Sequence, residues 1–455
     1  MKQLILACVL GVYGIAQLDA RPPVVRPRFV EEARLLLSAL PSPDGAGPFP
    51  SVNSLAISGD TLIVGARAPY DFIQWQEGTV TRGAGAAHVF IREQAGLTSV
   101  WREVATLAPT DPEDFDFGHS VAIEGDLAIV GVSNDRDSDI PTGAAYIYAR
   151  NQGGPNAWGE VARLTAGEDR CSFNNQAACE YYSFFGKSVA ISGNVAVVGA
   201  PAFSSDGDNN GPSVVYIFER NAGGPNAWGR TARFATDDVL ARLGAGVAVS
   251  GDTVIVGAPG DSSGPPGTAY VFARKRGPAA AWRPVATWTA PGSVDFGWSV
   301  AFTGDTALIQ SSSFSESGGW VEQAHVYSRT GRTTWRTGAV LQLTDPFRNG
   351  PVSIGVDLVS VGRSVFQRAS PTSVRWRPVD DVTVGDSGRL RSYGVVSTDT
   401  LAIAGSSLTN QGKFAPTIFI FVSDADGDGV RDEIDECPTD PSNQFKGRCE
   451  YRNHR

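Results

Sequence analysis

Ser188-Val189-Ala190-Ile191-Ser192-Gly193-Asn194-Val195-Ala196-Val197-Val198-Gly199 is one copy of a phrase that the chain repeats. Closely similar copies occupy Ser120–Gly131 and Gly246–Gly257. A phrase that recurs at intervals of tens of residues is typical of stacked or radial repeat architectures, so it decides the fold class. The shared residues are small and apolar packing residues, not reactive ones, which disfavours an enzyme.

Each copy predicts two β-strands joined by a tight turn. The first run, such as 188–192, alternates small or polar residues with apolar ones, which is the period of a strand. A Gly-Asp or Gly-Asn pair then supplies a hairpin turn. The run that follows is almost entirely apolar, as in a strand buried on both faces. Seven copies can be identified, with turn pairs at Gly59-Asp60, Gly125-Asp126, Gly193-Asn194, Gly251-Asp252, Gly304-Asp305, Val356-Asp357 and Thr398-Asp399.

Two more β runs complete each unit. One resembles Ala145–Tyr148, and the other resembles Glu160–Leu164. A tryptophan precedes the latter run in six units, where we expect it to pack the outer strand more readily than to stack on a sugar. Four strands per unit, with aromatic and glycine residues at regular places, are typical of a propeller blade. The six tryptophans are Trp101, Trp158, Trp228, Trp282, Trp335 and Trp376.

The order of the strands predicts how the array closes. The chain enters with a strand of the fourth type at 32–36 and leaves with one of the third type at 417–422. The first strand would therefore complete the last blade and remove an open sheet edge. We predict an all-β, seven-bladed propeller of four-stranded blades over residues 30–422, closed by its N-terminal strand. A linear solenoid is the alternative, but no cap-like segment is visible.

The repeats resemble the FG-GAP repeats of integrin alpha-subunit propellers, and more closely those of bacterial secreted proteins. The resemblance covers roughly residues 30–422 and implies a propeller of the cell-adhesion type. It is carried by Phe117-Gly118, Phe185-Gly186, Phe296-Gly297, Gly199-Ala200-Pro201 and Gly257-Ala258-Pro259.

The N-terminal segment and the cysteines favour export. Residues 1–20 have the charged start, apolar core and small cleavage site of a signal peptide, and 21–29 read as a linker. The four remaining cysteines form two local sets, which favours Cys171–Cys179 and Cys437–Cys449 disulfides over zinc ligation. We expect a secreted or cell-surface protein without a transmembrane segment.

The strongest chemical motif is the acidic stretch 424–435. Oxygen ligands at its positions 1, 3, 5, 7, 9 and 12, with Gly429 at the bend, suit calcium. Together with Cys437-Pro438, the stretch resembles a thrombospondin type 3 repeat, which implies a Ca²⁺-binding module over 423–455. The resemblance implies ligation by the carboxylates of Asp424, Asp426, Asp428, Asp432 and Asp435 and the carbonyl of Val430.

Two propeller segments, 134–139 and 206–211, keep some oxygen ligands but lack the full order of a calcium loop. We favour ordinary polar turns there over metal sites. The formal net charge of −10 argues against a nucleic-acid partner.

No histidine pairs obviously with a nucleophile, and the serines recur as strand residues. His88 and His325 occupy positions where other units have tyrosine, and His119 follows a Phe-Gly pair. We therefore expect a non-catalytic scaffold whose loops bind a protein or glycan partner. Two alternatives stay open: a polysaccharide hydrolase or lyase acting at the propeller mouth, and a structural surface or matrix component. The oligomeric state is unspecified.

Overall fold

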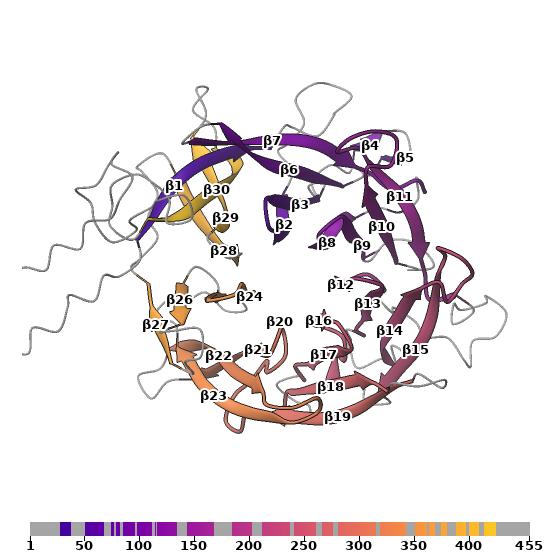
Figure 1. Ribbon diagram of the computed structural model, residues 1–455, viewed down its shortest axis with the longest axis vertical. Coiled ribbons are helices and arrows are strands. Elements are labelled where there is room, and N and C mark those ends of the chain that lie inside the picture. The colour runs from indigo at the N-terminus through magenta and orange to yellow at the C-terminus, as the bar shows by residue number, and fades with distance from the viewer. Residues whose placement is uncertain are drawn as a thin grey trace, which may run out of the picture.

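The described strands form a ring of seven sheets around a central opening (Figure 1). Each of the seven sheets has four antiparallel strands, and a separate two-stranded sheet lies between β3 and β6. No α-helix occurs among the described residues. The computed structural model describes residues 28–37, 51–67, 74–76, 79–81, 85–95, 98–111, 114, 116–133, 143–167, 184–202, 212–236, 241–260, 266–275, 281–314, 319–342, 351–361, 364–368, 375–379, 388–396, 400–408 and 414–424.

The first strand of each blade is innermost, and the second lies beside it. The innermost strands are β2 (Ser51–Ser58), β8 (Phe117–Glu124), β12 (Ser188–Ser192), β16 (Val247–Ser250), β20 (Val300–Thr303), β24 (Val352–Ile354) and β28 (Gly388–Val396). The second strands are β3 (Thr61–Arg67), β9 (Leu127–Val132), β13 (Val195–Ala200), β17 (Thr253–Ala258), β21 (Thr306–Phe314), β25 (Leu358–Val361) and β29 (Thr400–Leu408).

The third and fourth strands complete each blade outward. The third strands are β6 (Ala86–Ala95), β10 (Ala144–Arg150), β14 (Ser213–Arg220), β18 (Thr268–Arg274), β22 (Trp320–Arg329), β26 (Ser364–Arg368) and β30 (Phe414–Asp424). The outer strands are β7 (Thr98–Leu107), β11 (Trp158–Leu164), β15 (Trp228–Thr236), β19 (Trp282–Thr289), β23 (Trp335–Gln342), β27 (Trp376–Pro378) and, for blade seven, β1 (Arg28–Leu36). The small sheet pairs β4 (Gln74–Gln76) with β5 (Thr79–Thr81).

The repeated phrase forms the inner hairpin of a blade, as predicted. In blade three, Ser192 pairs with Val195, so Gly193 and Asn194 form a two-residue turn. Gly193 has φ 52°, which favours glycine, and glycine at the first turn position suits the twist of a hairpin. Every residue of β13 is buried, because the second strand packs against a neighbouring blade on each face.

The N-terminal strand closes the ring, as predicted. β1 pairs antiparallel with β30, with Ala33 opposite Ile420 and Leu35 opposite Ile418. The strand begins at Arg28, within the stretch expected to be a linker. Glu32 of this strand also bonds across the last junction: it accepts a hydrogen bond from Trp101 Nε1 at 3.0 Å and another from Ser99, both in blade one.

The Phe-Gly segments, or Leu243-Gly244 in blade four, meet the Gly-Ala segments, or Gly131-Val132 in blade two, at the junctions between blades. A Cβ on Gly199 of blade three would lie 2.2 Å from the carbonyl oxygen of Gly244 at the start of blade four. A Cβ on Gly131 would lie 2.1 Å from the same atom of Gly186. The phenylalanine before Gly186 is 1% exposed and lies 5.3 Å from the Tyr216 ring, measured between centroids. The motif is thus a contact between successive blades, where the backbones approach too closely for any other residue.

The two faces of the ring differ in their connections. Antiparallel pairing places the links from first to second and from third to fourth strands on one face, here called the turn face. The links from second to third strands and from each blade to the next lie on the opposite face, here called the loop face. On the loop face the links vary from 2 to 18 residues within blades and from 9 to 23 between them.

Candidate functional site

The central channel is walled by small and apolar residues. The inner strands enclose a cavity of about 320 Å³, lined by residues such as Ala122, Ile191, Val249 and Phe302. Among the described residues of this wall, none carries an ionisable side chain.

Ionisable residues gather instead at the start of blade two, on the loop face. The link from β7 to β8 brings three carboxylates to β3, β10 and β11. We call this group the blade-two cluster; it consists of Arg67, Asp111, Asp114, Asp116, His119, Tyr146 and Arg163.

Asp114 is the centre of one half of the blade-two cluster. Its carboxylate is 3% exposed and accepts hydrogen bonds from Tyr146 Oη at 2.5 Å and Arg163 Nη2 at 2.8 Å. Arg163 also pairs with Asp111 at 3.1 Å. Burial, together with the bond to Asp114, raises the pKa of Tyr146 to about 12, so its hydroxyl stays protonated and donates. These contacts satisfy a buried charge and fix the link before β8.

His119 and Asp116 form the other half. His119 Nδ1 lies 3.0 Å from Asp116 Oδ2, and Asp116 also pairs with Arg67 of blade one. Burial lowers the pKa of His119, against the opposing effect of the Asp116 bond, and the charge of Lys187 lowers it further. The ring is therefore neutral near pH 7, and because a carboxylate only accepts, Nδ1 carries the proton. The pair joins blade one to blade two, and the described contacts do not place a nucleophile beside it.

Sequence reasoning missed the blade-two cluster. It treated His119 as a residue following Phe-Gly and gave no role to the link before it. The signal was present: Asp111, Asp114 and Asp116 stand close together immediately before Phe117. Their partners come from other strands and, for Arg67, from another blade, so the sequence alone could not pair them.

In four blades, an arginine at or near the end of the third strand bonds to the preceding blade on the turn face. Each of these arginines pairs with the aspartate of its own hairpin turn, at 2.7 Å for Arg92–Asp60 and 2.8 Å for Arg329–Asp305. Each also donates to a threonine of the preceding blade. The four pairs are Arg92–Thr400, Arg150–Thr61, Arg329–Thr253 and Arg368–Thr306.

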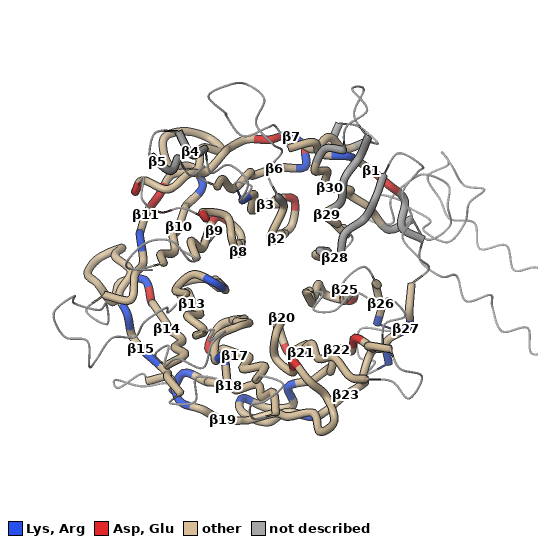
Figure 2. The backbone as a smooth tube through the Cα atoms, turned by 180° about the vertical axis from the view of Figure 1, so that it is seen from behind, with Lys and Arg blue, Asp and Glu red and all other residues tan. Residues whose placement is uncertain are grey.

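The repeated tryptophan packs under this arginine. The guanidinium lies 5.8 Å from the Trp101 ring centroid in blade one and 4.8 Å from that of Trp376 in blade six. Trp101 and Trp282 are 8% and 5% exposed. These two rings therefore pack the outer strands of their blades, as expected. Figure 2 shows the charged positions of the ring, with acidic ones on turns beside β2 and β9.

The expected calcium loop falls almost entirely outside the described residues. Asp424 ends β30, opposite Arg28 of β1, on the turn face. The other expected ligands, Asp426, Asp428, Val430, Asp432 and Asp435, lie outside the described ranges, as do segments 134–139 and 206–211 and all four cysteines of the expected disulfides. Within the described ranges, no group of three or more acidic, histidine or cysteine side chains is placed to hold a metal ion. Calcium binding therefore stays a prediction.

No membrane-spanning helix is found in the part of the chain that the structure describes. A search of curated proteins gave no significant match.

Solved structures with similar folds are distant from this chain. A sialidase of Trypanosoma rangeli is 13% identical with a TM-score of 0.35; the match covers 87% of this chain and 59% of the sialidase. The polysaccharide lyase Uly1 is 10% identical with a TM-score of 0.41, covering 82% and 90% of the two chains. A Dyadobacter fermentans protein of unknown function is 11% identical with a TM-score of 0.39, covering 87% and 99%.

The family comparison agrees with the junction geometry. The model of the FG-GAP repeat matches residues 101–148, 179–218 and 228–272, which include the glycine contacts between blades two and three, Gly131 to Gly186, and between blades three and four, Gly199 to Gly244. The chain thus carries FG-GAP repeats on a seven-bladed β-propeller of four-stranded antiparallel sheets.

Proposed function

We propose that this protein is an exported, non-catalytic scaffold that binds a protein or glycan partner through its loop face, with calcium ordering the segment after β30. The observation that supports this most is the use of the polar residues in the repeats. Their serines and arginines bond one blade to the next, as Ser188 Oγ does in donating to the Gly244 carbonyl at 2.7 Å, and the turn aspartates pair with those arginines within a blade. The blades are therefore bonded to one another, whereas the links of the loop face vary in length from blade to blade.

An exposed aromatic pair marks one place on the loop face where a partner could bind. Phe314 ends β21 and is 64% exposed, and Trp320 begins β22 and is 39% exposed. Their ring centroids are 5.5 Å apart in an edge-to-face arrangement. Exposed aromatic residues are enriched at binding surfaces, because they offer large contact areas with little conformational freedom to lose.

Site-specific cross-linking to captured partners tests the proposal. A photoreactive residue is placed at Phe314 on the loop face or at Val356 on the turn face; Val356 is a matched control because it is 60% exposed and apolar. The protein is then exposed to conditioned medium and to a glycan array, with and without calcium. We expect cross-linked partners from position 314 but not from 356. Failure to retain any protein or glycan, or equal cross-linking from both positions, would contradict the proposal.

A further inference from the structure

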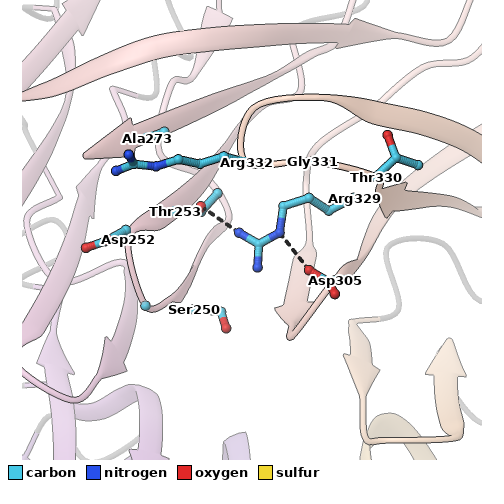
Figure 3. A pocket seen from close by; sticks show the side chains of 10 residues that line it. Ser250, Asp252, Thr253, Ala273, Asp305, Arg329, Thr330, Gly331 and Arg332 are labelled. Carbon is cyan, nitrogen blue, oxygen red and sulfur yellow. Dashed lines mark hydrogen bonds and ion pairs between the residues drawn. The ribbon is translucent and has the colours of Figure 1, made fainter. Parts of the chain in front are cut away.

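A pocket opens on the turn face between blades four and five (Figure 3). Its volume is about 590 Å³, within the range of small-molecule sites. Blade four contributes the turn from β16 to β17 and the end of β18. Blade five contributes the turn after β20 and the link from β22 to β23. The side chains used below are Ser250, Asp252, Thr253, Asp305, Arg329 and Arg332.

Arg329 is fixed on one side of this pocket. Its Nε donates to Asp305 Oδ1 at 2.8 Å, Nη1 donates to Thr253 Oγ1 at 3.0 Å, and Nη2 donates to the Gly304 carbonyl at 2.8 Å. The dashed lines in Figure 3 show the first two of these contacts. A guanidinium held by three acceptors is pre-organised, so a ligand that touches it does not have to order it.

Arg332 reaches across the junction from blade five. Its Nη2 donates to the backbone carbonyl of Arg274 in blade four at 2.7 Å. Among the described residues this is the one hydrogen bond of Arg332, and the guanidinium has further N–H groups to donate, since it carries five.

The link that carries Arg332 differs from those of blades two and three. There the corresponding links fold back on themselves, with Asn151 Oδ1 accepting from Asn156 N at 2.9 Å and Asn221 Oδ1 accepting from Asn226 N at 2.7 Å. The link in blade five is shorter and lacks this asparagine bond, and it places a long cationic side chain over the neighbouring blade. Neither of those two links contains an arginine, so the Arg332 donor is specific to this junction among these three blades.

The lining determines the class of ligand. Two guanidinium groups and two carboxylates balance in charge, so neither a simple anion nor a simple cation is favoured. The hydroxyls of Ser250, Thr253 and Thr330 add donors and acceptors, and the one apolar side chain in the lining is that of Ala273. We propose that this pocket binds a neutral saccharide, whose hydroxyls donate to Asp252 and Asp305 and accept from Arg332. This inference is independent of the proposed loop-face function, because the two sites lie on opposite faces.

Ligand titration of the full chain tests the pocket. The probes are maltotriose, cellotriose, mannotriose and xylotriose, with sulfate as an anionic probe, measured by saturation-transfer NMR and calorimetry. Arg332→Ala removes the cross-junction donor, and Ser250→Ala and Asp252→Asn alter the lining without removing that bond. Arg336→Ala is the matched control, because it removes an exposed arginine of the same blade that lies outside the pocket. Urea unfolding verifies that each variant is folded.

We expect at least one trisaccharide to bind. Its affinity should fall at least tenfold in Arg332→Ala, and it should fall measurably in Ser250→Ala or Asp252→Asn. It should change less than twofold in Arg336→Ala. The tenfold loss expected for Arg332→Ala is about 1.4 kcal/mol, which is modest for a hydrogen bond to a charged group. Three results overturn the proposal: no trisaccharide binds, Arg332→Ala and both lining variants bind as wild type does, or sulfate displaces the sugar.

Discussion

Replacing Gly199 with alanine should open the junction between blades three and four. The added Cβ would lie 2.2 Å from the Gly244 carbonyl oxygen, whereas a normal carbon–oxygen contact is longer by about 1 Å. The obstacle is backbone on both sides, so no rotamer change can relieve it. One blade must move away from the other.

The size of the effect follows from what that movement disrupts. The apolar cluster of this junction includes Val197, Ile217, Val254 and Trp282, all buried. A gap of 0.5–1 Å forfeits roughly a quarter to a half of the dispersion energy of each contact. Overpacking of a tight core typically destabilises by about 1–3 kcal/mol and occasionally by more, and a clash between two backbones that no rotamer relieves belongs to the larger values. We therefore expect Gly199→Ala to lower the free energy of unfolding by about 3–5 kcal/mol.

Urea unfolding monitored by tryptophan fluorescence measures the loss, with Gly193→Ala as the matched control. A Cβ at position 193 meets nothing within 4 Å, so that variant bears only the strain of a left-handed residue at φ 52°. This strain costs about 1–2 kcal/mol. A Gly199→Ala protein as stable as Gly193→Ala would refute the view that the Gly-Ala contact sets the spacing between blades.

Four further predictions concern ring closure, the arginine–threonine contacts, a buried histidine and the expected calcium loop. Glu32→Ala removes the acceptor for Trp101 and Ser99 at the ring closure, and should lower the free energy of unfolding by about 1.5–3 kcal/mol in urea. The control Glu31→Ala loses an exposed pair with Arg34, and should change it by less than about 0.5 kcal/mol. Arg150→Leu should destabilise by about 1–3 kcal/mol more than Arg220→Leu, because the blade before Arg220 presents Leu127 in place of a threonine; equal losses in urea would contradict the role of the threonine. Burial lowers the pKa of His325 to about 4, so the unfolded chain binds a proton at this histidine before the folded protein does, and the free energy of unfolding should fall as the pH falls from 6.5 to 4. His325→Tyr, which introduces the residue found at this position in other blades, should reduce the difference between the urea midpoints at pH 7.5 and pH 4.5. An unchanged difference would count against burial of His325 as the cause. Calcium should protect residues 423–455 from limited proteolysis in the wild type and in the control variant Asp440→Asn, but not in Asp428→Asn, which loses an expected ligand. Equal protection of all three proteins would contradict the prediction that 424–435 bind calcium.

The fold was predictable because its signals are local. The hairpin turn, the alternation of 188–192 and the apolar second strand each depend on neighbours in sequence, and the structure confirms them. Ring closure was predictable because a spare strand near Ala33 and a missing one beside Ile418 complement each other. The pattern repeats, so each copy reinforces the others.

The charged contacts were not predictable, because they join residues that are far apart in the chain. Arg67 meets Asp116, and Arg92 meets Thr400, only once the ring has formed. The aspartate of the turn illustrates the difference: its sequence context indicates a hairpin residue, and its pairing with an arginine appears only in space. Likewise Gln310 stands where the second strands of blades one to four have the junction glycine; that replacement is visible in the sequence, but its place in the interior is not.

The pairing of Arg28 with Asp424 has a mechanical consequence. Both strands reach the turn face at this pair, so tension applied through the segments that precede Arg28 and follow Asp424 acts on one end of an antiparallel ribbon. Its hydrogen bonds run perpendicular to the strands and would break one after another, not all at once. A pull on these two segments would therefore separate β1 from β30 one residue pair at a time, which requires only a low force.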